Sequence, residues 1–296
     1  MKIINTYIIS SEEVGMRFNA YCEGFIEEFP SKSGVKKAIL KGKLRLNGRF
    51  SKGDVWMQKG DAITVVDLEL KPPKVFKLVL EVLYEDAFMA VVNKPAGVTV
   101  SGNQFKTIVN CLPFNLEVST EKDALPWPLP VHRLDNLTSG VLLIAKTRKA
   151  RVVLGQLFED KKIQKTYHAL VMGRLEGVGI MDDDIEGKKS KTAFKSVEIV
   201  PSLQNDFLSL MELSPFTGRT HQIRIHLATL GFPILGDTLY AEKTLQHKGL
   251  FLVATKISFL HPILNDEICI EMPLPSKFKN RMQNEKTRWD RFHTQN

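Results

Sequence analysis

The chain has 296 residues, of which 43% are hydrophobic and 25% charged, and its formal net charge is +8. This length suits a small domain followed by a larger one, and no apolar run is long enough to cross a bilayer, so we expect no contact with a membrane. The basic excess favours a polyanionic partner. The odd, scattered cysteines exclude a disulfide framework, and the N-terminus is too polar for a signal peptide, so we expect a cytoplasmic protein.

The first 70 residues predict a small module in which two short helices are followed by short strands. Apolar residues have helical spacing between residues 16 and 29 and again between residues 35 and 40. Asn47-Gly48 predicts a tight turn, and residues 59–68 read as a turn followed by a β-branched run.

A one-signed basic patch spans residues 31–52 of this module. It contains no acidic residue, and its basic residues are Lys32, Lys36, Lys37, Lys41, Lys43, Arg45, Arg49 and Lys52. A charge run is more often a solvated helix face, but such a face usually carries interspersed carboxylates. We therefore interpret the patch as a nucleic-acid surface.

Residues 71–77, KPPKVFK, predict an extended linker, because two prolines and three lysines show neither a helical nor a strand period. Beyond it, residues 78–276 are rich in apolar or alternating runs, with helices predicted near 150–162 and 219–231. The fold class is therefore α+β, with a mixed, mainly antiparallel sheet and flanking helices. Residues 277–296 are assigned to a basic tail, whose charge is given little weight because it includes Glu285 and Asp290 and lies where chain ends commonly fray.

Three windows carry residues suited to chemistry. Asp135 follows His132 and Arg133 and precedes the turn residues 138–140; read alone, it is more often a carboxylate that caps its own turn. Tyr167, in an apolar strand, could stack on a base, although such a tyrosine is more often part of a core.

The third window, residues 213–231, places Arg219, His221, Arg224 and His226 at the opening of a helix, where anions are favoured. The two histidines are five residues apart and do not share a helix face, so no metal site is predicted. The aspartates of residues 181–190 could bind a divalent ion, but an exposed charged loop is favoured. No phosphate loop, dinucleotide fingerprint or serine nucleophile elbow occurs, so nucleotide hydrolysis, dinucleotide redox chemistry and serine-triad hydrolysis are not supported. Acid and base chemistry on a polyanion is the remaining class of reaction.

Four collinear motifs resemble the RluA-type family of RNA pseudouridine synthases. They are NKPAG at residues 93–97 within an opening strand motif, HRLD with TSG and KT between 132 and 147, KTYHAL at 165–170, and GRTHQIRIHLATLGFPILGDTLY at 218–240. The N-terminal module is similar to the RNA-binding domain of ribosomal protein S-four, through Gly42, Asn47-Gly48 and Gly60-Asp61.

The resemblance implies an enzyme that isomerises uridines of structured RNA, ribosomal or transfer, without a cofactor. Asp135 would be the acting carboxylate, attacking either the pyrimidine ring or the sugar, and Arg224 would pair with it. Tyr167 would stack on the flipped uracil and could assist a proton transfer, and Arg133 would fill the gap that the base leaves.

RNA contacts are expected from two groups of residues: His132, Arg133, Arg219 and His221 beside the site, and Lys36, Lys37, Lys41, Lys43 and Arg45 in the N-terminal domain. A monomer is expected. The alternative is a noncatalytic RNA-binding or ribosome-assembly factor on the same fold; the set of Asp135, Tyr167 and Arg224 argues against it, because a pure binder has no reason to keep a desolvated carboxylate near phosphates. A glycosidase would need a second paired acid, and none stands out.

Overall fold

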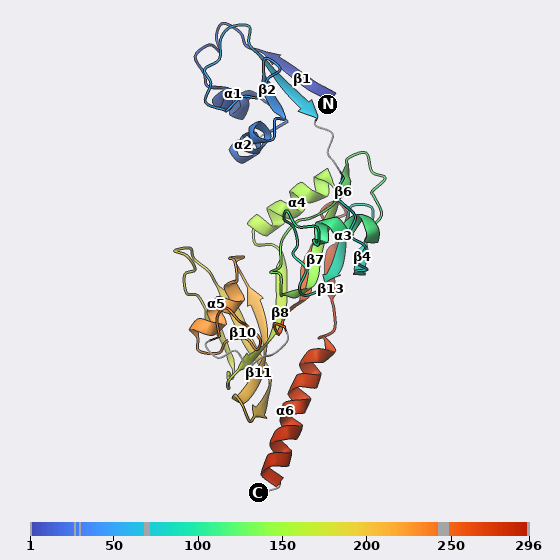
Figure 1. Ribbon diagram of the computed structural model, residues 1–296, viewed down its shortest axis with the longest axis vertical. Helices are drawn as coiled ribbons and strands as arrows, with labels where there is room; N and C mark the ends of the chain where they lie inside the picture. Colours follow the sequence, from blue (N-terminus) through green and yellow to red (C-terminus); the bar gives the residue numbers. More distant parts are fainter. Residues whose placement is uncertain (1, 27, 30, 68–71, 242–248, 295–296) are drawn as a thin grey trace. The chain divides into compact units, whose positions relative to one another are not determined.

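The computed structural model describes residues 2–26, 28–29, 31–67, 72–241 and 249–294 (Figure 1). The chain divides into two compact units, Met1–Pro72 and Pro73–Asn296. No helix in the described part of the chain is long and apolar enough to span a bilayer.

The N-terminal unit packs two helices on a three-stranded sheet of order β1-β3-β2, in which both pairings are antiparallel. Its core is formed by Phe18, Cys22, Val35, Leu44 and Ile63, all fully buried. The strand β1 precedes the helices, whereas the sequence pattern predicted strands only after them. Its elements are β1 (Lys2–Ile8), α1 (Phe18–Phe25), α2 (Lys32–Leu40), β2 (Leu44–Leu46) and β3 (Ala62–Asp67).

The Asn47-Gly48 turn of this unit is tied to the strand that follows. Both residues have positive φ, +50° and +72°, which a two-residue hairpin turn requires and which Asn and Gly tolerate. The Asn47 amide donates to Asp61 at 2.7 Å, and its carbonyl oxygen accepts the Ala62 N–H at 2.8 Å. These bonds join the turn to the start of β3.

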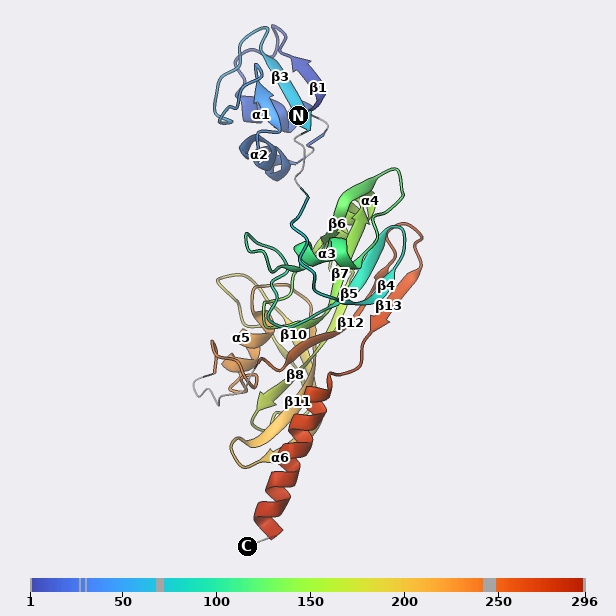
Figure 2. The same ribbon diagram turned by 45° about the vertical axis from the view of Figure 1, so that its right-hand side comes forward.

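The C-terminal unit is built on a mixed ten-stranded sheet of order β4-β5-β7-β12-β8-β11-β10-β9, with β6 on β7 and β13 on β12 (Figures 1 and 2). All pairings are antiparallel except the one between β7 and β12, so the predicted α+β class with a mainly antiparallel sheet is confirmed. The strands are β4 (Glu81–Glu85), β5 (Met89–Lys94), β6 (Ala124–Pro130), β7 (Ser139–Thr147), β8 (Gln164–Met172), β9 (Val178–Met181), β10 (Thr192–Ser202), β11 (Asp206–Pro215), β12 (Leu252–Leu260) and β13 (Glu267–Glu271).

The parallel pairing of β7 with β12 joins the two halves of this sheet, and it depends on Gly140. Gly140 lies opposite Ala254 and has φ +118°. A Cβ at this position would lie 2.0 Å from the Ala254 carbonyl oxygen. Only glycine therefore allows the two strands to approach this closely at the point where the chain enters β7.

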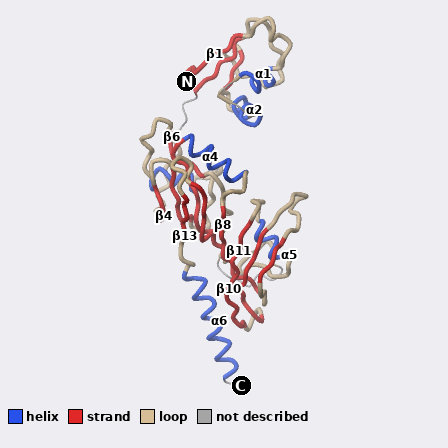
Figure 3. Tube along the Cα trace, turned by 180° about the vertical axis from the view of Figure 1, so that it is seen from behind, coloured by secondary structure: helices blue, strands red, loops and turns tan. Residues whose placement is uncertain are grey.

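In the described part of the chain, four helices contact this sheet: α3 (Ile108–Asn115), α4 (Arg148–Glu159), α5 (Gln222–Thr229) and α6 (Ser276–Thr294). Figure 3 shows α6 extending from the strands toward the C-terminus. α3 and α4 contact β6 and β7 in one half, while α5 contacts β11 and α6 contacts β10 in the other. Each half has its own buried core, and Tyr167 packs against both. The junction of the halves is therefore also the meeting point of the two cores.

Residues 277–296 were assigned to a basic C-terminal tail, and their described part forms the helix α6 rather than a frayed end. Phe278, Met282 and Glu285 recur with helical spacing and are buried on its inner face. The Ser202 hydroxyl at the end of β10 donates to the Glu285 carboxylate, and Arg281 pairs with that carboxylate at 2.9 Å. Basic residues dominate the composition of this segment, so its few buried positions, which anchor the helix, are not evident in the sequence pattern.

Candidate active site

A cavity of about 540 Å³ lies at the junction of the two half-sheets and gathers the three sequence windows. Asp135 comes from the loop before β7, Tyr167 from β8, and Arg224 from α5; all three line the cavity. The volume falls in the range of small-molecule sites, so the cavity can hold one nucleoside.

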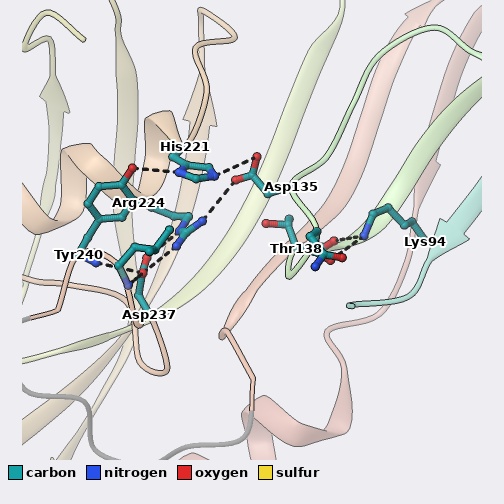
Figure 4. A network of polar contacts seen from close by, with 9 residues as sticks. Lys94, Asp135, Thr138, His221, Arg224, Asp237 and Tyr240 are labelled. Atoms are coloured by element: carbon teal, nitrogen blue, oxygen red, sulfur yellow. Dashed lines mark hydrogen bonds and ion pairs between the residues drawn. The ribbon is translucent and has the colours of Figure 1, made fainter. Parts of the chain in front are cut away.

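The loop that carries Asp135 is held from behind by Lys94 at the end of β5. The buried Lys94 ammonium donates to the carbonyls of Pro95 at 2.9 Å, Asn136 at 3.1 Å and Thr138 at 2.8 Å (Figure 4). Burial lowers the pKa of Lys94 to about 8, and the nearby negative charge of Asp135 opposes this shift. Lys94 therefore fixes the backbone on both sides of the turn and places a positive charge near the carboxylate.

Arg224 is anchored by a residue that the sequence analysis did not assign, Asp237. The guanidinium binds the Asp237 carboxylate in a bidentate manner, Nε to Oδ2 at 2.7 Å and Nη2 to Oδ1 at 2.8 Å, with both side chains almost fully buried (Figure 4). Asp237 Oδ1 also accepts the N–H groups of Leu239 and Tyr240. Burial alone would lower the pKa of Arg224, but Asp237 outweighs it and the pKa is raised.

The third guanidinium nitrogen of Arg224 faces one oxygen of the Asp135 carboxylate, and His221 faces the other oxygen (Figure 4). Arg224 Nη1 lies 3.9 Å from Asp135 Oδ2, and His221 Nε2 lies 3.9 Å from Oδ1. His221 has φ +55° at the start of α5, and its Nδ1 lies 2.9 Å from the Tyr240 hydroxyl. Each carboxylate oxygen therefore faces a nitrogen group that is close enough for electrostatic attraction but not for a hydrogen bond.

Tyr167 lines the cavity, and its hydroxyl is protonated because its pKa is raised. Burial, and secondarily the negative charge of Asp135, raises the pKa of Tyr167. The residue is half-buried in a strand whose neighbours are Leu213 on β11 and Ala254 on β12. The hydroxyl can donate a hydrogen bond, and the ring is available for stacking within the cavity.

The other residues predicted beside the site differ in what they can contribute. Arg133 and Arg219 are exposed at the cavity. His132 lines the cavity too, but its Nε2 accepts the Leu143 N–H at 3.0 Å and its ring lies 4.9 Å from that of Phe158. Burial, with a smaller contribution from the charge of Lys165, lowers the pKa of His132 to about 3. His132 is therefore a neutral wall of the cavity rather than a cation.

The predicted RNA contacts of the basic patch lie in the N-terminal unit. Lys36, Lys37 and Lys41 are exposed on and just after α2, while Lys43 and Arg45 are half-buried. The Arg45 guanidinium donates to the Gly42 carbonyl at 3.3 Å, which holds it against the turn. The N-terminal unit has a cavity of its own, of about 590 Å³, which is lined by Lys32, Lys36 and Lys52 together with Phe50.

Lys94, Asp237 and Tyr240 are the site residues that received no role from the sequence. All three fall within motifs quoted for the resemblance, NKPAG and GDTLY. Their presence in these motifs was the available sequence signal. Their roles depend on hydrogen bonds to residues distant in sequence: Lys94 binds a residue more than 40 positions away, and Asp237 binds one 13 positions away.

Comparison with known proteins supports one family. Residues 89–229 match the RNA pseudouridylate synthase family. The chain is 32% identical, over 94% of its length and 96% of the relative's, to ribosomal large subunit pseudouridine synthase C of Vibrio vulnificus. It is also 32% identical, over 84% of its length and 87% of the relative's, to the uncharacterized RNA pseudouridine synthase YhcT of Bacillus subtilis.

A solved structure shares the fold: human RNA pseudouridylate synthase domain containing 1 matches with a TM-score of 0.55 and 25% identity, covering 70% of this chain and 86% of the human one. The cavity at the sheet junction is thus set in a fold that such synthases share. With relatives this similar along nearly the whole sequence, the chain belongs to the RNA pseudouridine synthase family, whose members are isomerases.

Proposed function

We propose that this protein converts uridines of ribosomal RNA to pseudouridine and that Asp135 is its acting carboxylate. The observation that carries the proposal is the convergence of Asp135, Tyr167 and Arg224 on one cavity of nucleoside size. The names of the relatives, ribosomal large subunit pseudouridine synthases, favour ribosomal over transfer RNA as the substrate. A monomer that works in the cytoplasm stays a prediction.

The reaction moves the glycosidic bond of uridine from uracil N1 to C5; C5 releases its hydrogen as a proton, and N1 gains a proton. The base must leave the RNA stack to enter the cavity. We assign stacking on the flipped uracil to Tyr167, and the space left in the RNA to the exposed Arg133. Arg224, clamped by Asp237, contributes a fixed positive charge beside Asp135, and the attack on base or sugar is assigned to the Asp135 carboxylate.

Release of the C5 hydrogen provides the test. Purified protein is incubated with ribosomal and transfer RNA that lack modification and carry tritium at uracil C5, and tritium release is measured. We expect release from ribosomal RNA by the wild type and a fall of at least about 1,000-fold for Asp135→Asn, because the nucleophile is removed.

Asp182→Asn is the matched control, since Asp182 is an exposed carboxylate of the loop after β9 and does not line the cavity. It should release tritium at the wild-type rate. Release by Asp135→Asn at the wild-type rate would refute the assignment of Asp135. Release from transfer RNA alone would refute the choice of ribosomal RNA.

A further inference from the structure

The turn that carries Asp135 contains a second polar side chain, the buried hydroxyl of Thr138. Thr138 is 2% exposed, and its Oγ1 is closed to solvent and has no hydrogen-bond partner among the described residues. Leaving a buried hydroxyl unpaired is unfavourable, and most such groups in proteins are paired. The position of this hydroxyl therefore calls for a partner that the described part of the free protein does not supply.

Hydrogen bonds fix the backbone around Thr138, so a disordered backbone does not explain why the hydroxyl is unpaired. The Thr138 N–H donates to the Asp135 carbonyl at 3.2 Å, and the Thr138 carbonyl accepts from Lys94 at 2.8 Å. Lys94 also binds the Asn136 carbonyl. Main chain on both sides of the hydroxyl is thereby fixed.

A candidate acceptor for this hydroxyl is the Asp135 carboxylate, at the other end of the same turn. Figure 4 shows Thr138 between the Asp135 side chain and Lys94. In the described part of the chain, the charged neighbours of the Asp135 carboxylate lie at 3.9 Å, beyond hydrogen-bond distance. Its side chain is 20% exposed and borders the cavity. An unpaired donor and an unsatisfied acceptor thus lie three residues apart.

We propose that Thr138 is a positioning residue whose hydroxyl donates a hydrogen bond to the Asp135 carboxylate when uridine occupies the cavity. This inference rests on the proposed role of Asp135. An O–H···O⁻ hydrogen bond is short and strong, and it fixes the direction of the acceptor. A carboxylate that attacks a carbon atom must be held in one orientation, and its charged neighbours at 3.9 Å provide attraction without direction.

Thr138→Val tests this because valine keeps the shape and removes only the hydroxyl. We expect the melting temperature to stay the same or rise, since the substitution breaks no hydrogen bond of this hydroxyl in the free protein. In the tritium-release assay, kcat should fall at least about 10-fold while KM for RNA stays within about twofold, because the bond acts on the reacting carboxylate and not on RNA binding.

Thr99→Val is the matched control. The Thr99 hydroxyl is likewise enclosed and unpaired among the described residues, but Thr99 does not line the cavity. Its removal should leave kcat unchanged. Thr138→Ser and Thr138→Ala form a second pair that differs only in the hydroxyl, and serine should retain most of the kcat that alanine loses, even if valine does not fold.

Three results would overturn the inference: a Thr138→Val kcat within twofold of wild type, equal losses for the serine and alanine variants, or a rise in KM with unchanged kcat. The last would mean that the hydroxyl binds RNA directly. Asp135→Asn, assayed in parallel, separates this failure from failure of the proposed function. An active Asp135→Asn refutes the role of Asp135, whereas an inactive one beside an active Thr138→Val refutes only the role of Thr138.

Discussion

At the scale of single residues, the buried charges of the site each have a partner: Arg224 pairs with a carboxylate, and Lys94 binds backbone carbonyls. Asp237 holds the guanidinium plane of Arg224 beside Asp135. Lys94 binds the loop of Asp135 through two carbonyls, those of Asn136 and Thr138. A buried arginine without such a partner would be strongly unfavourable. The side chains that stabilise this region are therefore also the ones that place positive charge beside Asp135.

Asp237→Asn is expected to lower the free energy of unfolding by about 3–5 kcal/mol, because it leaves the Arg224 charge buried without its partner. Burial raises the pKa of Asp237, but Arg224 and two backbone N–H groups outweigh it, so the pKa lies below its ordinary value of 3.8. A depressed carboxyl pKa stabilises the fold above the unfolded pKa, and this contribution is lost as pH falls through the folded pKa. The stability gap between wild type and variant should therefore close below pH 3.8.

Urea unfolding of both proteins at several pH values measures this gap. Glu176→Gln is the control, because Glu176 also pairs with an arginine, Arg174 at 3.2 Å, but both side chains are more than half exposed. An exposed pair contributes at most about 1 kcal/mol. Equal losses for the two variants would contradict the importance that we give to the buried pair.

At the scale of elements, the junction between β7 and β12 decides where the site lies. Asp135 precedes β7, and Tyr167 lies on β8, which pairs with β12. The strands β7 and β12 meet at Gly140 and Ala254. A change in this pairing would move Asp135 and Tyr167 apart.

Gly140→Ala should destabilise the protein by about 4 kcal/mol or more, since its Cβ would lie 2.0 Å from a backbone oxygen and the backbone has φ +118°. Gly155→Ala, in the middle of α4 with nothing within 4 Å of the added Cβ, should instead stabilise by up to about 1 kcal/mol. Chemical denaturation measures both. A small effect of Gly140→Ala would mean that the two half-sheets tolerate separation.

At the scale of the whole molecule, the N-terminal unit supplies exposed positive charge and the C-terminal unit supplies the cavity. If the basic patch binds phosphates, replacing Lys36, Lys37 and Lys41 by glutamine should weaken RNA binding and reduce the slope of log K against log salt. The expected reduction is about 0.7–0.9 for each phosphate that a lysine no longer neutralises. Binding measured between low and moderate salt gives this slope.

A second triple variant, with glutamine at the exposed Lys122, Lys149 and Lys195 of the C-terminal unit, changes the net charge equally. It should alter the slope less. Equal slopes for the two triple variants would show that the patch acts only through overall charge.

The sequence by itself determined the fold class, the family and the residues to test first. Alternating and helical periods are local properties, so β7, β8 and α4 were predictable from runs of neighbouring residues. Asp135, Tyr167 and Arg224 were identified through a resemblance carried by four motifs, and the structure places all three at one cavity.

Only the tertiary structure decided how those residues are held. α3 contains Pro113, which reads as a helix breaker, and β1 pairs with β3, which follows both helices of the unit, so neither element followed from local pattern. α6 was masked by its charges. The roles of Lys94, Asp237 and Thr138 depend on which backbone and side-chain groups surround them after folding. Hydrogen-bond partners that are distant in sequence leave no periodic signal. For this physical reason the sequence identified the residues of the site but not the contacts that hold them in place.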